Sequence, residues 1–283
     1  TLYDVPADVT AAIAPNGAAA MVTTTVPGQN ARLTFTGVAN QRVSLALTGS
    51  CCATTLSVLK PDASTLASIT TFGSGGFLDT QRLPAGGTYT IVVDPQGVAT
   101  GAMTLTLYDV PPDVTGTLVP DGPPVTLTLG TPGQNARLTF EGTAGRQVTL
   151  AISNVTIGSS LLGGARISIL KPDGSELGTP ITVGTSGGTI DRVTLPATGT
   201  YTAVVDPIGS ATGSATLTLH DVPTDVVASI APGGPPLTVT ITSPGQNARV
   251  TFTGSAGQRV SLEVANVSIG PSTCCGAKLS LLD

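Results

Sequence analysis

The stretch Pro27-Gly-Gln-Asn-Ala-Arg-Leu-Thr-Phe35 decides the fold, because it joins a turn signal to a strand pattern. Proline followed by glycine is typical of a tight turn. After that turn, Leu33 and Phe35 alternate with Thr34 and Thr36. Alternation of apolar and polar residues with a period of two predicts a strand with one buried face. The stretch therefore predicts a turn that leads into a half-buried β-strand.

The first six residues of this stretch return twice, so the chain is a repeat protein. Pro27–Arg32 recurs at Pro132–Arg137 and at Pro244–Arg249, with spacings of 105 and then 112 residues. A second marker, Thr-Leu-Tyr-Asp-Val-Pro with His for Tyr in its last copy, moves in the same register, at Thr1–Pro6, Thr106–Pro111 and Thr218–Pro223. A period of this length is that of a whole domain. We therefore predict an array of domains, each with its own core.

The same alternation continues through each repeat, with turn signals every 8–12 residues. We count eight or nine short strands per repeat and no helical stretch, which is typical of an antiparallel β-sandwich. The pattern does not choose between Greek-key and jelly-roll-like wiring. The predicted fold is all-β, a tandem array of such sandwiches. The predicted core residues are Leu33, Phe35, Val43, Leu45, Tyr89 and Ile91, with Leu138, Phe140, Val148, Leu150 and Tyr201 in the second repeat.

The markers place the domain boundaries at recurring Asp-Val-Pro-x-Asp-Val segments. Proline stiffens these segments toward extended backbone, which predicts a semi-rigid rod. The predicted domains are residues 1–10 as the last strand of a preceding repeat, 11–112 and 113–224 as complete sandwiches, and 225–283 as the first part of a third. We expect either that the protein continues at both ends or that neighbouring molecules supply the missing strands, and we favour the first.

Composition restricts the partners. The 283 residues carry a net charge of −5, charged residues are only 10%, and Trp is absent. An acidic chain without a basic patch does not suit nucleic acid, and no apolar run approaches the length of a membrane helix. Disorder is also disfavoured, because 40% of the residues are hydrophobic. We expect self-association into a homopolymer or bundle, with no membrane insertion; contact with carbohydrate or a cell surface stays open.

Four short runs resemble bacterial pre-peptidase C-terminal domains, small β-sandwiches of secreted and cell-surface proteins. The runs are Gly-Gln-Asn-Ala-Arg-Leu-Thr-Phe, Gly257–Leu262, Ile169–Gly174 and Leu195–Thr202. They are strand and turn residues in the family's order. The resemblance implies a sandwich fold and a location outside the cell or on its surface. It supplies no catalytic residues to carry over.

The four cysteines form two adjacent pairs, Cys51-Cys52 and Cys274-Cys275, in the same predicted inter-strand loop of repeats one and three. An extracellular location favours oxidised sulfur. Neighbouring Cα atoms are about 3.8 Å apart, below the usual disulfide window of about 4.4–6.8 Å, so a ring within a pair is strained. Three states remain open: a ring within each pair, a bond to another molecule or to sequence outside this chain, and free thiols. Zinc is disfavoured because no histidine is near.

The other recurring polar residues are interpreted as structural. His220, the only histidine, replaces Tyr3 and Tyr108 at one repeat position. The carboxylates in the boundary segments between domains could hold calcium. However, no Asp-x-Asp-x-Asp run is present, and Asp is common as a turn cap. These carboxylates are Asp4, Asp8, Asp109, Asp113, Asp221 and Asp225. We therefore predict no metal site and no cofactor.

Three further patterns receive the same structural interpretation. A recurring arginine and a recurring aspartate predict an ion pair or a hydrogen bond to a loop; they are Arg32, Arg137 and Arg249, and Asp79 and Asp191. Lys60-Pro-Asp62 and Lys171-Pro-Asp173 are expected to be turns. Two short matches to the glycosylation sequon, Asn154-Val-Thr156 and Asn266-Val-Ser268, are expected to be unmodified if the source is a bacterium.

The sequence thus predicts a non-catalytic structural protein, an extracellular rod or filament of tandem sandwiches. The alternatives are an accessory repeat array of a larger secreted enzyme and a cell-surface adhesin. The adhesin ranks lower because sugar platforms usually need exposed aromatic rings, and only 3% of the residues are aromatic. An enzyme within these residues ranks last, since the sequence has no nucleophile elbow, phosphate loop or His-Asp-Glu cluster.

Overall fold

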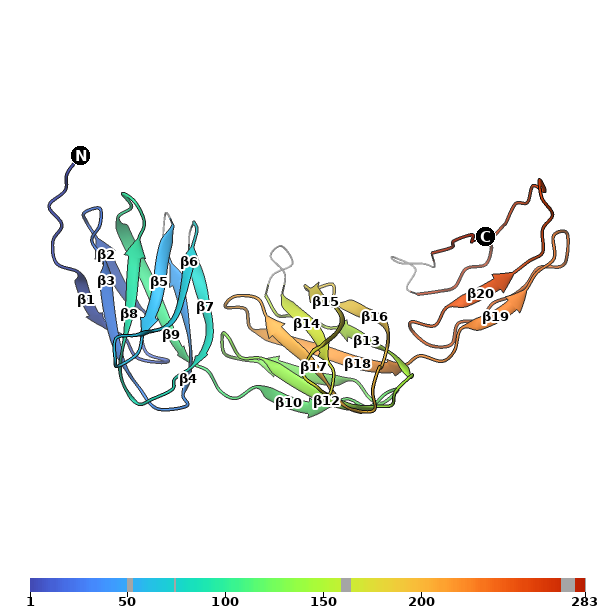
Figure 1. Cartoon of the computed structure of the whole chain (residues 1–283), viewed down its shortest axis with the longest axis horizontal. Coiled ribbons are helices and arrows are strands. Elements are labelled where there is room, and N and C mark those ends of the chain that lie inside the picture. The colour runs from blue at the N-terminus through green and yellow to red at the C-terminus, as the bar shows by residue number, and fades with distance from the viewer. Residues whose placement is uncertain (50–52, 74, 159–163, 271–277, 283) are drawn as a thin grey trace.

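A computed structural model of the chain describes residues 1–49, 53–73, 75–158, 164–270 and 278–282. Every regular element in these residues is a β-strand (Figure 1). The all-β prediction is therefore confirmed. No helix long and apolar enough to span a membrane occurs in that part of the chain.

The first repeat, which we call unit 1, consists of two sheets. Its described residues form nine strands, within the predicted eight or nine: β1 (Val9–Ala12), β2 (Ala20–Thr24), β3 (Ala31–Gly37), β4 (Arg42–Thr48), β5 (Thr54–Leu59), β6 (Thr65–Thr71), β7 (Gly75–Arg82), β8 (Gly87–Pro95) and β9 (Gly101–Asp109). One sheet has the order β1-β3-β8-β5-β6, and the other has the order β2-β9-β4-β7.

The second repeat, unit 2, copies this topology strand by strand. Its described strands are β10 (Val114–Thr117), β11 (Val125–Leu129), β12 (Ala136–Gly142), β13 (Gln147–Ser153), β14 (Ala165–Leu170), β15 (Glu176–Val183), β16 (Gly188–Thr194), β17 (Gly199–Pro207) and β18 (Gly213–Asp221). The two sheets have the orders β10-β12-β17-β14-β15 and β11-β18-β13-β16. The repeat in sequence is therefore a repeat in structure.

The five-stranded sheet of each unit is mixed rather than purely antiparallel, which corrects one detail of the prediction, whereas the four-stranded sheets are antiparallel throughout. β1 pairs in parallel with β3, and β10 pairs in parallel with β12. The cause is the path of the chain. Because β2 lies in the opposite sheet, the chain reverses twice between β1 and β3, so these two strands run in the same direction.

Each unit has its own apolar core, and both of its sheets contribute to it. In unit 1, Leu33 from β3 and Leu45 from β4 belong to different sheets and lie in one cluster. The predicted core residues are at most 3% exposed and are therefore confirmed: Leu33, Phe35, Val43, Leu45, Tyr89, Ile91, Leu138, Phe140, Val148, Leu150 and Tyr201.

In units 1 and 2 a buried tyrosine links the core to the loop that precedes the strand of that tyrosine. The ring of Tyr89 stacks on Phe35 with centroids 5.3 Å apart, and its hydroxyl donates to the carbonyl oxygen of Ala85 over 2.8 Å. In unit 2, Tyr201 donates to the carbonyl of Ala197 over 2.7 Å and stacks on a phenylalanine at 5.4 Å. The polar end of each ring is thus satisfied inside the protein.

The two ends of the chain have fewer strands than the repeats predict. Residues 1–8 contain no strand, and β1 begins at Val9 and pairs within unit 1, so the predicted boundary at 10/11 falls inside β1. In the described part of the third repeat, unit 3, one parallel pair forms, β19 (Val226–Ser229) with β20 (Ala248–Thr251).

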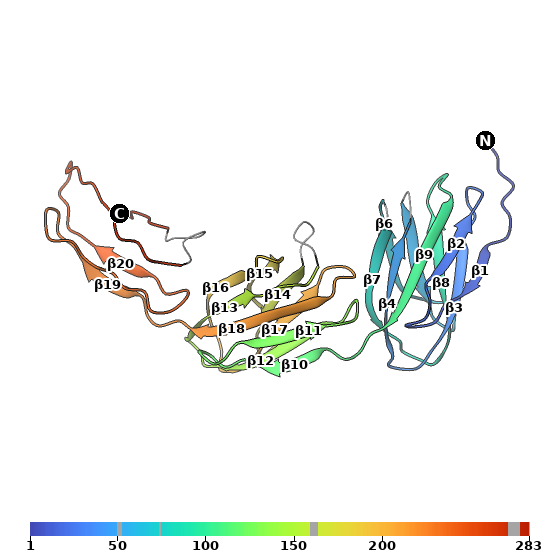
Figure 2. The ribbon, with the colours of Figure 1, turned by 180° about the vertical axis from the view of Figure 1, so that it is seen from behind.

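The units follow one another along the long axis of the molecule. Figure 1 shows β1–β9, β10–β18 and β19–β20 in succession, and Figure 2 shows the same order from behind. The two termini lie in the outermost units. Units 1 and 2 meet end to end, and this places the recurring sequence motifs at their contact.

Candidate functional site at the joints between units

The recurring motifs meet where one unit ends and the next begins. We call the contact between units 1 and 2 joint 1 and the contact between units 2 and 3 joint 2. Each joint contains the linker after the last strand of one unit and the Pro-Gly turn of the next. The Pro-Gly turns are Pro27–Gly28, Pro132–Gly133 and Pro244–Gly245.

A glutamine fastens each Pro-Gly turn to the linker in front of its own unit. Gln134 Nε2 donates to the carbonyl of Pro112 over 3.0 Å, and its Oε1 accepts from the amide of Gly130 at 3.3 Å. The equivalent donations are both 2.9 Å long, from Gln29 to Ala7 and from Gln246 to Thr224. The side chain uses both ends of its amide, so the turn and the linker are held as one piece.

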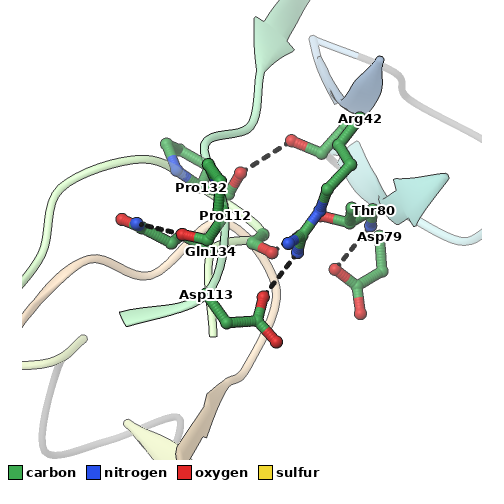
Figure 3. A network of polar contacts seen from close by, with 9 residues as sticks. Arg42, Asp79, Thr80, Pro112, Asp113, Pro132 and Gln134 are labelled. Carbon is green, nitrogen blue, oxygen red and sulfur yellow. Dashed lines mark hydrogen bonds and ion pairs between the residues drawn. The ribbon is translucent and has the colours of Figure 1, made fainter. Parts of the chain in front are cut away.

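In joint 1 the Pro-Gly turn of unit 2 lies against the end of the β2-β9-β4-β7 sheet of unit 1 (Figure 3). Ser44 on β4 donates from its Oγ to the carbonyl of Pro132 over 2.7 Å. Thr80 on β7 donates from its Oγ1 to the carbonyl of Gly133, also over 2.7 Å. Ser44 lies between the core residues Val43 and Leu45, so its side chain points away from that core; it is only 1% exposed because unit 2 covers it.

A β-bulge brings these two hydroxyls together. Opposite Ser44, strand β7 has two residues, Asp79 and Thr80, where the register shifts. Asp79 Oδ1 accepts the amide of Thr80 at 2.7 Å. A bulge turns a side chain out of the regular alternation, and here it directs Thr80 to the joint. Unit 2 has the same register shift, and Arg192 donates its amide to Asp191 over 2.7 Å.

The contact requires glycine in the turn. Gly133 has a φ of 84°, and a Cβ there would lie 2.5 Å from Thr80 Oγ1 and 3.0 Å from Ser44 Cβ. Gly28 has almost the same φ, 87°, but its Cβ would meet only Val5 Cγ2 at 3.5 Å. The backbone conformation is therefore shared, whereas the collision with a preceding unit belongs to Gly133.

An ion pair closes joint 1 beside the turn. Arg42 Nη2, at the start of β4, lies 2.7 Å from Asp113 Oδ1 in the linker (Figure 3), and the two side chains are 25% and 21% exposed. Charges that are partly removed from water attract one another more strongly than fully exposed ones. The pair connects the two units directly.

Joint 2 also sets a Pro-Gly turn against the end of the preceding sheet, but its side-chain contacts differ in two ways. Thr149, equivalent to Ser44, is 1% exposed, and a Cβ at Gly245 would lie 2.2 Å from its Oγ1. The hydroxyl of Thr149 has no hydrogen-bond partner in the part of the chain that the structure describes. The ion pair forms between Arg192, on strand β16, and Asp225 of the linker.

The other recurring carboxylates also face donors. Asp8 pairs with Arg32 inside unit 1 at 2.7 Å, and Asp109 accepts from the amide nitrogen of Gln41 at 2.9 Å. Asp221 pairs with Arg146 of unit 2. No group of three or more metal-binding side chains occurs in the described residues. Five of the six recurring aspartates, all but the exposed Asp4, are thus partners of arginine or glutamine.

Asp206, near joint 1, has a shifted pKa. Partial burial raises the pKa of this carboxyl above its ordinary value, and the negative charges of Asp79 and Asp113 raise it further, against the opposing effect of Arg166. Asp206 belongs to unit 2 and Asp79 to unit 1. The two units therefore bring carboxylates of the same sign toward one another at this joint.

His220, Asp62 and Asp173 each lie beside a polar neighbour. His220 lies on β18 with its Nδ1 3.7 Å from Asp121. Asp62 and Asp173 cap their turns: hydrogen bonds from the hydroxyl and amide of Ser64 and Ser175 lower the pKa of the two carboxyls. The predicted disulfide candidates Cys51, Cys52, Cys274 and Cys275 lie outside the described residues.

The recurring arginine and the recurring aspartate, predicted to form an ion pair or a hydrogen bond to a loop, contact other groups rather than each other. Arg32 binds Asp8, whereas Asp79 and Asp191 cap the amide of the bulge residue that follows. Sequence reasoning missed the arginines that do cross the joints, because Arg42 and Arg192 hold different repeat positions. The feature that could have revealed these arginines is an exchange between repeats. Gln147 of unit 2 stands at the position of Arg42, and Arg192 of unit 2 stands at the position of Thr80.

The solved structures to which the chain is similar include distant ones from secreted and periplasmic proteins. No family model and no curated protein matches it. The pre-peptidase C-terminal domain of a collagenase from Bacillus anthracis is 12% identical with a TM-score of 0.31, over 37% of this chain and 99% of that domain. PliG, a periplasmic lysozyme inhibitor from Aeromonas hydrophila, is 17% identical with a TM-score of 0.28, over 36% and 99%. The PBSX exported protein XepA is 10% identical with a TM-score of 0.27, over 72% and 86%. These values assign neither a family nor an activity.

Proposed function

We propose that this chain is a stretch of an extracellular structural rod or filament, built from tandem β-sandwich units of the pre-peptidase C-terminal type. Joint 1 carries the proposal. There, Ser44 and Thr80 of unit 1 bind the two turn carbonyls of unit 2, and Arg42 binds its linker. Because hydrogen bonds and an ion pair fix the turn on the preceding unit, the units are expected to move as one body. Such a joint transmits force along the chain.

The outward faces of the sheets suit lateral self-association. On the β1-β3-β8-β5-β6 sheet of unit 1, hydroxyls pair across strands, Thr55 with Thr70 at 3.3 Å and Ser57 with Ser68 at 2.8 Å. Only 10% of the residues of the chain are charged. Contacts between such faces rely on packing and hydroxyl hydrogen bonds rather than on ion pairs. We therefore expect side-by-side copies to pack into a bundle or filament.

Negative-stain microscopy of the purified chain, at low salt and at about 1 M salt, tests the proposal. The Debye length falls to about 3 Å at 1 M, which weakens exposed charge contacts, whereas a partly buried pair such as Arg42–Asp113 is screened much less. We expect uniform elongated particles or filaments at both salt concentrations. Isolated, bent particles with variable angles between units would contradict the rod and would favour an accessory array of a larger secreted enzyme.

Electrophoresis without reductant, after thiol blocking, tests whether the cysteines contribute to assembly. A ladder of multimers that collapses with reductant supports cross-links between chains, whereas a monomer in both lanes removes the cysteines from the assembly. This result bears on how filaments are held together and leaves the rod of units unaffected.

A further inference from the structure

The arginine that crosses each joint comes from a different strand. In joint 1 it is Arg42, at the start of β4, with Thr80 at the bulge position of β7. In joint 2 the bulge position holds Arg192, and the residue equivalent to Arg42 is Gln147. One position loses its arginine where the other gains it. The acceptors, Asp113 and Asp225, occupy the same repeat position.

The bulge explains why two positions serve one acceptor. Strands β4 and β7 are neighbours, and the register shift sets Asp79 and Thr80 opposite Ser44. Thr80 and Ser44 bind consecutive carbonyls of one turn, so the bulge residue lies at the same contact as the start of β4. An arginine at either place is long enough to reach the linker aspartate, which follows the last strand of the unit that supplies the arginine.

We infer that the joint is a two-position clamp, in which an arginine at the Arg42 or the Arg192 position fixes the aspartate of the following unit and sets the orientation between units. The inference rests on the proposed rod and names the residues that stiffen it. It also states what kind of surface can precede a unit: a sheet end with a small hydroxyl residue at the Ser44 position and one arginine at either clamp position.

In unit 1 the aspartate at this repeat position has a different kind of partner. Asp8, at the repeat position of Asp113 and Asp225, binds Arg32 of its own unit at 2.7 Å. The side chains of that pair are 46% and 31% exposed, against 25% and 21% for Arg42 and Asp113. The pair across the joint is thus the less exposed one. Arg32 provides a matched control, because its loss removes an equal charge and leaves the joints intact.

Residual dipolar couplings of the full chain, fitted separately for units 1 and 2, test the clamp. We expect one shared alignment tensor in the natural protein, two different tensors in Arg42→Gln, and a shared tensor again in Arg42→Gln/Thr80→Arg, which carries the clamp residues of unit 2. Asp113→Asn should behave like Arg42→Gln. Arg32→Gln should keep the shared tensor.

Two results would overturn the clamp: a shared tensor retained in Arg42→Gln, or no recovery in the double variant. The couplings within each unit report whether that unit stays folded, so unfolding is recognised separately. If Thr80→Arg itself disturbs unit 1, the reverse exchange Gln147→Arg/Arg192→Thr in unit 2 tests the same rule at joint 2. Failure of filament formation in the microscope with a shared tensor would reject the proposed function and leave the clamp standing.

Discussion

The hydroxyl of Ser44 and the carbonyl of Pro132 lie 2.7 Å apart, although 88 positions separate the two residues in the chain. In an isolated unit 1 this serine would face water, because its neighbours on β4 fill the core. Its burial is a consequence of the next unit. The bond can therefore form only when the two units are docked. Thr149, the residue equivalent to Ser44 at joint 2, has no such partner among the described residues.

Substitutions at these two equivalent positions should have opposite effects. Ser44→Ala leaves the carbonyl of Pro132 without its donor, and we expect a loss of about 1–3 kcal/mol in the free energy of unfolding. Thr149→Val keeps the shape and removes a buried hydroxyl without a partner, so stability should stay equal or rise by up to about 1 kcal/mol. Urea unfolding of the full chain measures both. Equal losses would show that the hydroxyls play the same part at both joints.

Gly133→Ala should loosen joint 1, and Gly28→Ala should not. Both substitutions place a side chain at a positive φ, which costs about 1 kcal/mol in each case. Only at Gly133 would the new Cβ lie 2.5 Å from a hydroxyl of the preceding unit. We expect the larger loss of melting temperature, and a larger radius of gyration in X-ray scattering, for Gly133→Ala. The same change in both variants would mean that backbone strain alone explains the glycine.

The strands and cores could be predicted from the sequence because period-two alternation is a local signal. Leu33 and Phe35 face the core for the same reason that Thr34 and Thr36 do not. The parallel pairing of β1 with β3 could not be predicted in this way, because it depends on which sheet β2 joins. Pro95 shows a similar limit: Asp94-Pro95 reads as a turn, yet Pro95 is the last residue of β8 and pairs with Thr54.

The joint was only partly predictable. The repeats singled out the Pro-Gly turn and the linker aspartates, since residues that return in every unit serve every unit. The clamp arginines do not return at one position, so a search for recurring residues passed over Arg42 and Arg192. The bulge that makes the two positions equivalent is a register shift between β4 and β7, which the alternation within one strand does not reveal.

Tyr201→Phe should weaken unit 2 without affecting its docking. The substitution removes the hydroxyl that donates to Ala197 and retains the ring in the core. The expected loss is about 1 kcal/mol, the usual net value of one hydrogen bond. Calorimetry of the full chain gives the shift in melting temperature. Tyr3→Phe is the control, because Tyr3 is 44% exposed and surface substitutions usually stay within about 0.5 kcal/mol; a Tyr201→Phe shift no larger than this control would refute the role of the bond.

Asp206→Asn should stabilise the chain at neutral pH. The folded protein raises the pKa of this carboxyl, first through burial and then through Asp79 and Asp113, so the ionised form is less favourable in the folded than in the unfolded state. The penalty is fully present above the folded pKa, falls as the pH drops through it, and vanishes below the unfolded value of about 3.9. Asparagine removes the charge and hence the penalty.

The melting temperature of Asp206→Asn should therefore exceed that of the natural protein at pH 7, and the two curves should converge toward pH 3. Asp94 provides the matched comparison at the same repeat position of unit 1. Its Oδ2 accepts a hydrogen bond from Gln96 at 3.0 Å, so Asp94→Asn should bring no gain at pH 7. A lower melting temperature of Asp206→Asn at pH 7 would contradict this prediction. It would mean that the attraction between Asp206 and Arg166 outweighs the repulsion of Asp206 by Asp79 and Asp113, so that the ionised carboxylate stabilises the folded chain.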